Sequence, residues 1–352
     1  MKRSQFEDFE GLFQQVVGRR ETQLLDDIEL QDFFCSSRIL IVGAGGSIGS
    51  AIAKRLISAK VRNVFFLDRD ESSLHRLALE LSDMSASQSD NCFVADIRDL
   101  QSLREVFELV KPTIVIHAAA LKHLVILERF PREGFLTNII GTLNVAKLCT
   151  EFEISQFVNI STDKAANPIS VLGKTKKIAE LLTEEIFMNS ILTQCSVRFG
   201  NVFASRGSVI ETFVHQITHD IPVTVTHPEV ARFFMSRNEA ANLVLAVASL
   251  KESGTYIQNM GEEVLLMKVV ERIAQHFGKR PTINTIGLFS GEKLHEELFD
   301  GPTLPTKFID ISRSIHSIKS GLTVEIEDSI PTNNAHAIKV INELASKYLK
   351  NL

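Results

Sequence analysis

The sequence predicts an α/β fold built on a doubly wound parallel sheet. Short, continuously apolar runs alternate with amphipathic segments from residue 37 onward. Such runs, separated by helices, are typical of parallel strands that are covered on both faces. A glycine-rich turn, GAGGSIG (43–49), follows the first run and opens an amphipathic helix, which is the pattern of a Rossmann-like unit. Right-handed crossovers then place helices on both sides of the sheet.

The individual elements follow from the same periodicity. Strands are expected at the apolar runs 38–43, 63–68, 91–96, 113–120, 156–162 and 195–202, with a late strand at 255–261 that returns to the sheet. Helices are expected between them at 48–59, 71–81, 100–110, 141–151 and 173–188. The polar stretch 82–91 has the composition of a surface loop.

Changes in residue composition and hydrophobic pattern divide the chain into four parts. The N-terminal part is amphipathic and is expected to form helices that pack on the main body or on a second subunit. Turn-rich sequence beyond residue 200 predicts a smaller C-terminal lobe that binds substrate. We place the N-terminal helical extension at 1–36 and the Rossmann domain at 37–200, with a returning part at about 231–280. The lobe is expected at 201–230 and 281–333, and a C-terminal helix at 334–352.

Composition narrows the class of protein. The chain has 352 residues, of which 44% are hydrophobic and 23% charged, and its net charge of −5 gives no general attraction for nucleic acid or anionic membranes. Four scattered cysteines lack metal or redox spacing, and His227 and His295 lack a third ligand, so no metal site is expected. No apolar run approaches the roughly 18 residues of a membrane span. The N-terminus lacks the apolar core of a signal peptide, so a cytoplasmic location is expected.

The glycine-rich turn predicts a dinucleotide cofactor, NAD or NADP. Gly43 permits the tight turn, Gly46 lets the backbone approach a pyrophosphate, and Gly49 allows close packing of the helix on the strand. The free N–H groups of the helix N-terminus, at Ser47 and Ile48, would face the phosphates.

Residues at the strand ends indicate how the rest of the cofactor would lie. Asp68 ends the second strand and could accept hydrogen bonds from both ribose hydroxyls, which favours NAD. Arg69 could instead meet a 2′-phosphate, so NADP stays an alternative. After the third strand, the residues expected near the adenine are Asp96 and Ile97. After the fourth strand, the residues expected near the nicotinamide are Ala118, Ala119, Ala120 and Lys122.

The segment STDKAANP (161–168) follows the fifth expected strand and carries candidate catalytic residues. Thr162, Asp163 and Lys164 would place a hydroxyl, an acid and a base on one short segment facing the nicotinamide. In the helix that follows, Lys174 and Lys177 are expected to face solvent.

Several long motifs together resemble one family. GAGGSIGS, HAAALKH, STDKAANP, GKTK, PVTVTHPEVARFFM and GEKLHEEL occur in the order found in UDP-N-acetylglucosamine 4,6-dehydratases, which are extended short-chain dehydrogenases/reductases of polysaccharide biosynthesis. The resemblance covers about residues 38–298. It implies oxidation of the sugar at C4 by NAD(P), elimination of water across C5 and C6, and reduction at C6.

The resemblance also implies roles for the catalytic candidates. Asp163 would be the acid toward the C6 hydroxyl, Lys164 the base at C5 with a lowered pKa, and Thr162 a hydrogen-bond partner of the C4 oxygen. Lys176 would bind the nicotinamide ribose. Leu172 stands where the superfamily usually carries a catalytic tyrosine, so deprotonation of the C4 hydroxyl would fall to Thr162, Asp163 or a water, assisted by Lys176.

By the same resemblance, the lobe would bind a UDP-sugar. Arg232 would bind phosphate in bidentate fashion, and Glu292 would hold the uridine ribose. Phe289 replaces the arginine that relatives usually carry before GEK, which leaves the exact sugar open. The resemblance also implies contacts of Lys122 and His123 with the sugar. It implies contacts of Asn201, Ser208 and Val209 with the diphosphate, and of Thr224 and Thr226 with the uracil.

Alternatives remain at this point. The motifs leave open retention or inversion at C5, and a UDP-sugar 4-epimerase would need only hydride removal and return at C4. A non-catalytic homologue that binds NAD and a nucleotide sugar belongs to a different class. A homo-oligomer is expected, because relatives assemble through helices beside the sheet.

Overall fold

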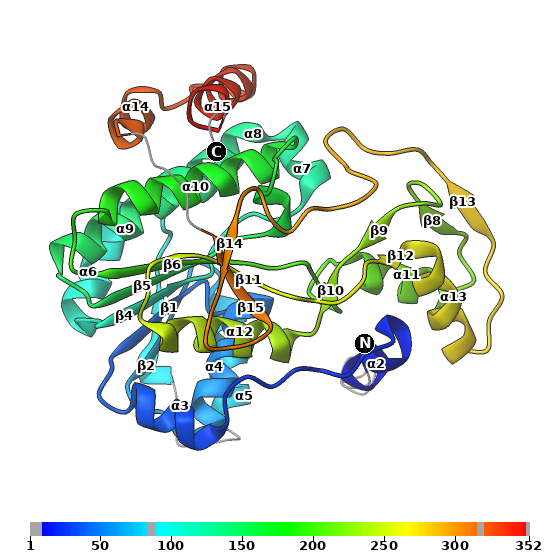
Figure 1. Cartoon of the computed structure of the whole chain (residues 1–352), viewed down its shortest axis with the longest axis horizontal. Coiled ribbons are helices and arrows are strands. Elements are labelled where there is room, and N and C mark those ends of the chain that lie inside the picture. Colours follow the sequence, from blue (N-terminus) through cyan, green and yellow to red (C-terminus); the bar gives the residue numbers. More distant parts are fainter. Residues whose placement is uncertain (1–8, 83–88, 315–319, 350–352) are drawn as a thin grey trace.

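The computed structural model describes residues 9–82, 89–314 and 320–349. It shows a twisted sheet with helices on both faces and a smaller lobe beside it (Figure 1). Parts of the predicted extension, loop, lobe and C-terminal helix, at 1–8, 83–88, 315–319 and 350–352, lie outside the described residues.

Within these ranges nine strands form one sheet, in the order β14-β15-β11-β6-β5-β4-β1-β2-β3. Neighbours from β3 to β11 pair in parallel, and β15 and β14 extend the edge in antiparallel fashion. This order confirms the Rossmann-like doubly wound fold. The strands are β1 (Ile39–Val42), β2 (Val64–Asp68), β3 (Cys92–Val94), β4 (Ile114–His117), β5 (Gln156–Ile160), β6 (Thr193–Arg198), β11 (Gly254–Gln258), β14 (Thr303–Pro305) and β15 (Ile311–Ser314).

Alternate side chains of β1 enter two different cores. Ile39 and Ile41 pack with helices on one face, whereas Leu40 and Val42 pack with helices on the other. All four are fully buried, which explains why the strand is a continuous apolar run. The first face carries α3 (Asp27–Phe34), α4 (Ser47–Ser58), α5 (Glu71–Ser82) and α12 (Arg237–Leu250), and the second carries α6 (Leu100–Val110), α9 (Gly141–Glu151) and α10 (Val171–Phe187).

The lobe has its own apolar core, with Phe203, Phe213 and Val269 among its members. It is joined to the sheet domain where β7 (Asn201–Val202) pairs with β10 (Phe234–Met235). Its other elements are α11 (Val209–Thr218), β8 (Val223–Val225), β9 (Ala231–Arg232), β12 (Val264–Leu265), α13 (Leu266–His276) and β13 (Ile283–Thr285).

Two segments lie differently from the division drawn on sequence. Helix α13 falls in the predicted returning part but packs in the lobe core, because its apolar face meets α11 and the N-terminal helix α2 (Phe9–Val17). Strands β14 and β15 fall in the predicted lobe but pair at the edge of the main sheet. In Figure 1, α14 (Leu322–Asp328) and α15 (Asn334–Tyr348) lie against α10, as their shared apolar cluster requires.

Short helical turns complete the described chain. They are η1 (Ser89–Asn91), α7 (Leu124–Arg129), α8 (Pro131–Gly134), η2 (Phe135–Ile140) and η3 (Asp163–Ala165). Within the described ranges, none of the helices combines the length and the apolar composition of a membrane span.

Candidate active site

The glycine-rich turn between β1 and α4 is shaped by close backbone contacts. Gly43 has a φ of +85°, and a Cβ there would lie 2.5 Å from the Ala119 nitrogen. A Cβ on Gly49 would lie 2.2 Å from the Gly43 carbonyl oxygen. Gly46 caps α4 without a side-chain hydrogen bond, so the first N–H groups of this helix stay available to an anion.

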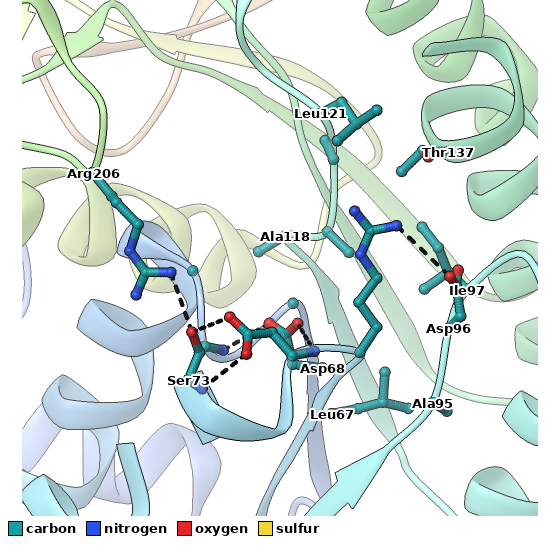
Figure 2. Close-up of a pocket in the computed structure, with 17 residues that line it drawn as sticks. Leu67, Asp68, Ser73, Ala95, Asp96, Ile97, Ala118, Leu121, Thr137 and Arg206 are labelled. Carbon is teal, nitrogen blue, oxygen red and sulfur yellow. Dashed lines mark hydrogen bonds and ion pairs between the residues drawn. The ribbon is translucent and has the colours of Figure 1, made fainter. Parts of the chain in front are cut away.

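An open cavity lies beside this turn (Figure 2). Most of the predicted cofactor residues line it, together with several that sequence reasoning did not single out. The predicted ones are Gly43, Gly46, Asp68, Arg69, Asp96, Ile97, Ala118, Ala119 and Ala120, and the added ones include Gly45, Asp70, Ser73, Thr137 and Arg206. Ser47, Ile48, Gly49, Lys122 and Lys176 do not line it.

The acidic residue at the end of β2 is held by backbone donors. Asp68 Oδ2 accepts a hydrogen bond from Gly45 N at 2.9 Å, and Oδ1 accepts one from Asp70 N at 3.0 Å. Arg69, which could have met a 2′-phosphate, lies 3.7 Å from Asp96. Both carboxylates therefore have fixed positions at the cavity wall.

Arg206 reaches the cavity beside the glycine-rich turn from the lobe side (Figure 2). Its backbone nitrogen donates to Ser47 Oγ at 3.0 Å, and its guanidinium donates to Ser73 Oγ at 3.1 Å. The signal in the sequence was its place in SRGSV, two residues before the predicted Ser208. Only the fold brings this loop back over α4 and α5.

The catalytic candidates on the segment after β5 form one cluster, in which Asp163 is buried and Thr162 and Lys164 are partly exposed. Asp163 is fully buried, and its Oδ1 accepts hydrogen bonds from Thr162 Oγ1 at 2.9 Å and Lys164 Nζ at 3.0 Å. Lys164 Nζ also donates to Asn201 Oδ1 at 3.3 Å and lies 3.3 Å from Glu296 Oε1. A hydroxyl, a carboxylate and an amine thus meet at the carboxyl end of the sheet.

The expected lowering of the Lys164 pKa is wrong for this structure. Burial lowers this pKa, but the charges of Asp163 and Glu296 outweigh burial and raise it above the ordinary lysine value. The amine is therefore protonated at neutral pH. Sequence reasoning counted burial but could not supply the second carboxylate.

Lys176 on α10 has a pKa below the ordinary lysine value. Burial lowers it to about 8, although the charge of Glu180 opposes this shift. Leu172, one turn earlier, is 5% exposed and packs in the apolar cluster of α10. His117 is buried beneath the site, and burial with the nearby Lys176 charge lowers its pKa to about 3, so it is neutral.

The prediction that Lys177 faces solvent is wrong. Its side chain is 1% exposed, and Nζ lies 2.6 Å from Asp300 Oδ2 and 3.4 Å from Glu180 Oε2. Helix α10 is covered by the sheet on one side and by C-terminal segments on the other, so few of its positions reach water. Lys174 is partly exposed, and its Nζ donates a hydrogen bond to Asn342 Oδ1.

Three predicted substrate residues meet inside the lobe. Arg232 is 4% exposed and donates to Glu292 Oε1 at 3.1 Å, and Thr226 Oγ1 donates to the same oxygen at 3.0 Å. The Arg232 guanidinium also donates to the carbonyls of Ala231 and Leu294. Arg232 is thus largely occupied by protein groups, and its phosphate contact stays a prediction.

Most of the other predicted substrate residues fall into two sets. Lys122 donates to Ser205 Oγ at 3.2 Å, and a Cβ on Gly207 would lie 2.8 Å from His123 Cε1. Burial lowers the pKa of both Lys122 and His123. The second set lies on the lobe elements, where Ser208 caps α11, Val209 begins it, and Thr224 on β8 bonds Gln216.

Comparison with known proteins gives this geometry a family. A family model described as "Polysaccharide biosynthesis protein" matches residues 39–311. The capsular polysaccharide biosynthesis protein CapD of Staphylococcus aureus is 38% identical over 327 residues, which cover 90% of this chain and 54% of that protein. The chain belongs to this polysaccharide biosynthesis protein family. It spans about half the length of CapD.

Two further relatives frame this member of the polysaccharide biosynthesis protein family. A protein named UDP-glucose 4-epimerase from Rickettsia canadensis is 32% identical over 272 residues, covering 75% of this chain and 78% of that protein. The X-ray structure of Pen from Bacillus thuringiensis superimposes with a TM-score of 0.69 at 34% identity, covering 76% of this chain and 83% of that one. The fold is therefore that of the extended short-chain dehydrogenase/reductase group of nucleotide-sugar epimerases and dehydratases.

Proposed function

We propose that this chain is a nucleotide-sugar 4,6-dehydratase that converts UDP-N-acetylglucosamine to a UDP-4-keto-6-deoxy sugar for surface polysaccharide or glycan biosynthesis. The observation that carries this proposal is the ion pair between the buried Asp163 and the partly buried Lys164 after β5. An acid and a base on one short segment are what the elimination of water requires. The apolar Leu172 in the position of the usual tyrosine supports the same reading.

The cavity beside the glycine-rich turn fits a dinucleotide cofactor. The turn leaves no room for a side chain at Gly43, and the N-terminus of α4 offers free N–H groups to a pyrophosphate. A bound nicotinamide would supply reversible hydride acceptance from C4 of the sugar. We favour NAD over NADP, because Asp68 and Asp70 both line the cavity and would repel a 2′-phosphate.

The catalytic residues divide the proton transfers between them. Asp163 gives a proton to the departing C6 hydroxyl, and Lys164 removes the proton from C5. A prior proton transfer from the Lys164 ammonium to the Asp163 carboxylate would prepare both groups, since they lie 3.0 Å apart. Thr162 orients the C4 oxygen. Lys176 binds the nicotinamide ribose and assists deprotonation of the C4 hydroxyl, a role that its pKa of about 8 supports.

In this proposal the lobe holds the UDP portion of the substrate. Arg232 and Thr226 hold the Glu292 carboxylate in place to accept hydrogen bonds from the uridine ribose. Lys122 and His123 contact the sugar in this proposal. Asn201, Ser208 and Val209 contact the diphosphate, and Thr224 contacts the uracil. Phe289 is 41% exposed and supplies no cation, so the diphosphate must be neutralised by other residues.

A UDP-sugar 4-epimerase is the second candidate. The relative from Rickettsia canadensis that carries this name favours it. An epimerase exchanges hydride at C4 alone and needs no acid and base for C5 and C6, so the Asp163–Lys164 pair favours elimination. A non-catalytic homologue would bind NAD and a nucleotide sugar without turnover.

Proton NMR of the purified protein with UDP-N-acetylglucosamine in heavy water separates these possibilities. We expect a new C6 methyl signal with deuterium at C5, whose couplings report retention or inversion. A shift to the C4 epimer alone would support the epimerase. An unchanged spectrum from protein that carries the cofactor would support the non-catalytic reading or another sugar.

We also propose that the protein acts in the cytoplasm as a homo-oligomer. The helices beside the sheet offer faces for assembly. Light scattering after size-exclusion chromatography measures the mass directly, and a monomer mass at all concentrations would contradict the assembly.

A further inference from the structure

Glu296 is a buried carboxylate that the proposed proton transfers do not use. It is 6% exposed and follows the GEK motif, in the segment that leads back from the lobe to the sheet. Its Oε1 atom lies 3.3 Å from Lys164 Nζ. Its Oε2 atom is also buried and has no hydrogen-bond partner among the described residues.

The backbone around Glu296 is fixed by contacts to the lobe. Glu296 N donates to Glu263 Oε1 at 3.0 Å. Two residues earlier, the Leu294 carbonyl accepts from Ala231 N at 3.0 Å and from the Arg232 guanidinium at 3.1 Å. The segment is thus tied to β9, and the direction of the Glu296 side chain is set by the lobe.

Charged and polar groups from four elements face the Lys164 amine. Asp163 comes from η3, Asn201 from β7, Glu296 from the returning segment and Arg232 from β9. Asp163 is the neighbour of Lys164 in the chain and is proposed to give away a proton during the reaction. Of the carboxylates that the structure describes around the amine, Glu296 is the one with no proposed proton transfer. Arg232 Nε lies 4.0 Å from the same oxygen, Glu296 Oε1.

We propose that Glu296 is a positioning residue for Lys164, whose carboxylate fixes the direction of the amine and stabilises its positive charge. This inference rests on the proposed role of Lys164 as the base at C5. Once Lys164 has taken the C5 proton, its new charge lies beside a carboxylate in a buried site. There, opposite charges attract more strongly than in water. Glu296 also makes the base depend on the lobe, because the same segment carries contacts of Arg232.

The test is an NMR titration of lysine side chains in the full-length protein labelled with carbon-13 at Cε, with the Lys164 signal assigned by Lys164→Arg. In Glu296→Gln, the Lys164 pKa should fall by about 1 to 3 units, because an opposite charge within hydrogen-bond distance favours the charged form by that amount. The adjacent and exposed Glu297→Gln is the matched control and should leave this titration unchanged.

Two outcomes would overturn the inference, namely an unchanged Lys164 titration in Glu296→Gln or an equal fall in Glu297→Gln. Glu296→Asp keeps the charge and serves if the glutamine variant does not fold. Its Lys164 pKa should stay nearer the wild-type value than that of a neutral side chain. The titration needs no turnover, so a wild-type protein without dehydratase activity would contradict the proposed function and leave the Glu296 result readable.

Discussion

Asp163 has two carboxylate oxygens with different surroundings. Oδ1 accepts from Thr162 and Lys164, whereas Oδ2 is buried and has no partner among the described residues. A buried acceptor without a donor is costly, and such groups are often retained for function. The free oxygen is the atom that would meet the C6 hydroxyl of a bound sugar.

Asp163→Asn tests this role. The amide keeps the shape of the side chain but cannot give up a proton, so formation of the C6 methyl product should fall about 10²- to 10⁴-fold. Cofactor binding should not change. The measurement is the NMR assay in heavy water, with Asp328→Asn on exposed α14 as the control. Unchanged turnover in Asp163→Asn would remove the acid from this position.

Glu184 on α10 is a second carboxyl group with an unpaired buried oxygen. Its Oε1 accepts from Thr255 Oγ1 at 3.1 Å, and Oε2 has no partner among the described residues. Burial and the charge of Glu180 raise its pKa from 4.5 to about 7. Because the folded-state pKa is raised, the folded protein is favoured below pH 4.5, and this advantage is lost as pH rises through about 7.

Glu184→Gln should therefore stabilise the protein in a pH-dependent way. Above pH 7 the glutamine avoids the buried charge, and we expect a gain of about 1 to 3 kcal/mol in the free energy of unfolding. The gain should disappear as pH falls toward 4.5. Urea unfolding at both pH values measures it, and Glu108→Gln, at an exposed position of α6, should show no such dependence. A gain of equal size at both ends of the range would argue against a titrating Glu184.

At the scale of the element, α10 connects the proposed catalytic segment to the C-terminal part of the chain. Glu180 accepts from Ser161 Oγ at 2.6 Å, directly before Thr162, and pairs with Arg198 at 2.7 Å. Arg198 pairs in turn with Asp300 at 2.9 Å. The side chains of this network, from Asp300 through Arg198 and Glu180 to Ser161, are buried throughout. The network therefore holds the returning segment against the strand that precedes the proposed acid and base.

Asp300→Asn should weaken this connection. Removing one charge from a buried ionic network costs about 3 to 5 kcal/mol, because the remaining charges stay buried. We expect a loss of that order in urea unfolding at neutral pH. Asp310→Asn, on an exposed position of the same segment, is the control. If both variants lost equally little, the network would not hold the segment.

At the scale of the whole molecule, the N-terminal extension spans both parts. Helix α2 packs in the lobe core and α3 in the sheet core. Between them, Arg19 pairs with the buried Glu239 at the start of α12 and donates to the Phe234 carbonyl at 2.8 Å. Thr22 N donates to the same carboxylate at 2.9 Å. The extension therefore links the lobe to the sheet domain.

Arg19→Ala should loosen this link without unfolding the core. Loss of a partly buried charge pair shifts local opening by more than about 1.4 kcal/mol, which corresponds to about tenfold faster cleavage near Leu24 and Leu25 by thermolysin. Arg20→Ala, an exposed neighbour, should be cleaved at the wild-type rate. Equal rates for both variants would contradict a docked extension.

Much of the fold and of the candidate site was predictable from local patterns. Apolar runs and helical periodicity located the sheet, because parallel strands buried on both faces leave a continuous signal. The helices at 100–110 and 141–151 match α6 and α9 in their bounds. The turn at Gly43 was also visible, because its shape depends on neighbouring residues in the chain, and the catalytic role of the segment at Asp163 stays a prediction.

Tertiary structure alone decided the charges around that segment and the edges of the lobe. Glu296, Asp300 and Arg206 reach the site from distant segments, and no periodicity places them beside Lys164, Lys177 or the cofactor cavity. The sequence determined by itself which residues could donate, accept or transfer a proton. The pKa direction of Lys164 and the burial of Lys177 depend on packing across the fold, because electrostatic interactions act through space and not along the chain.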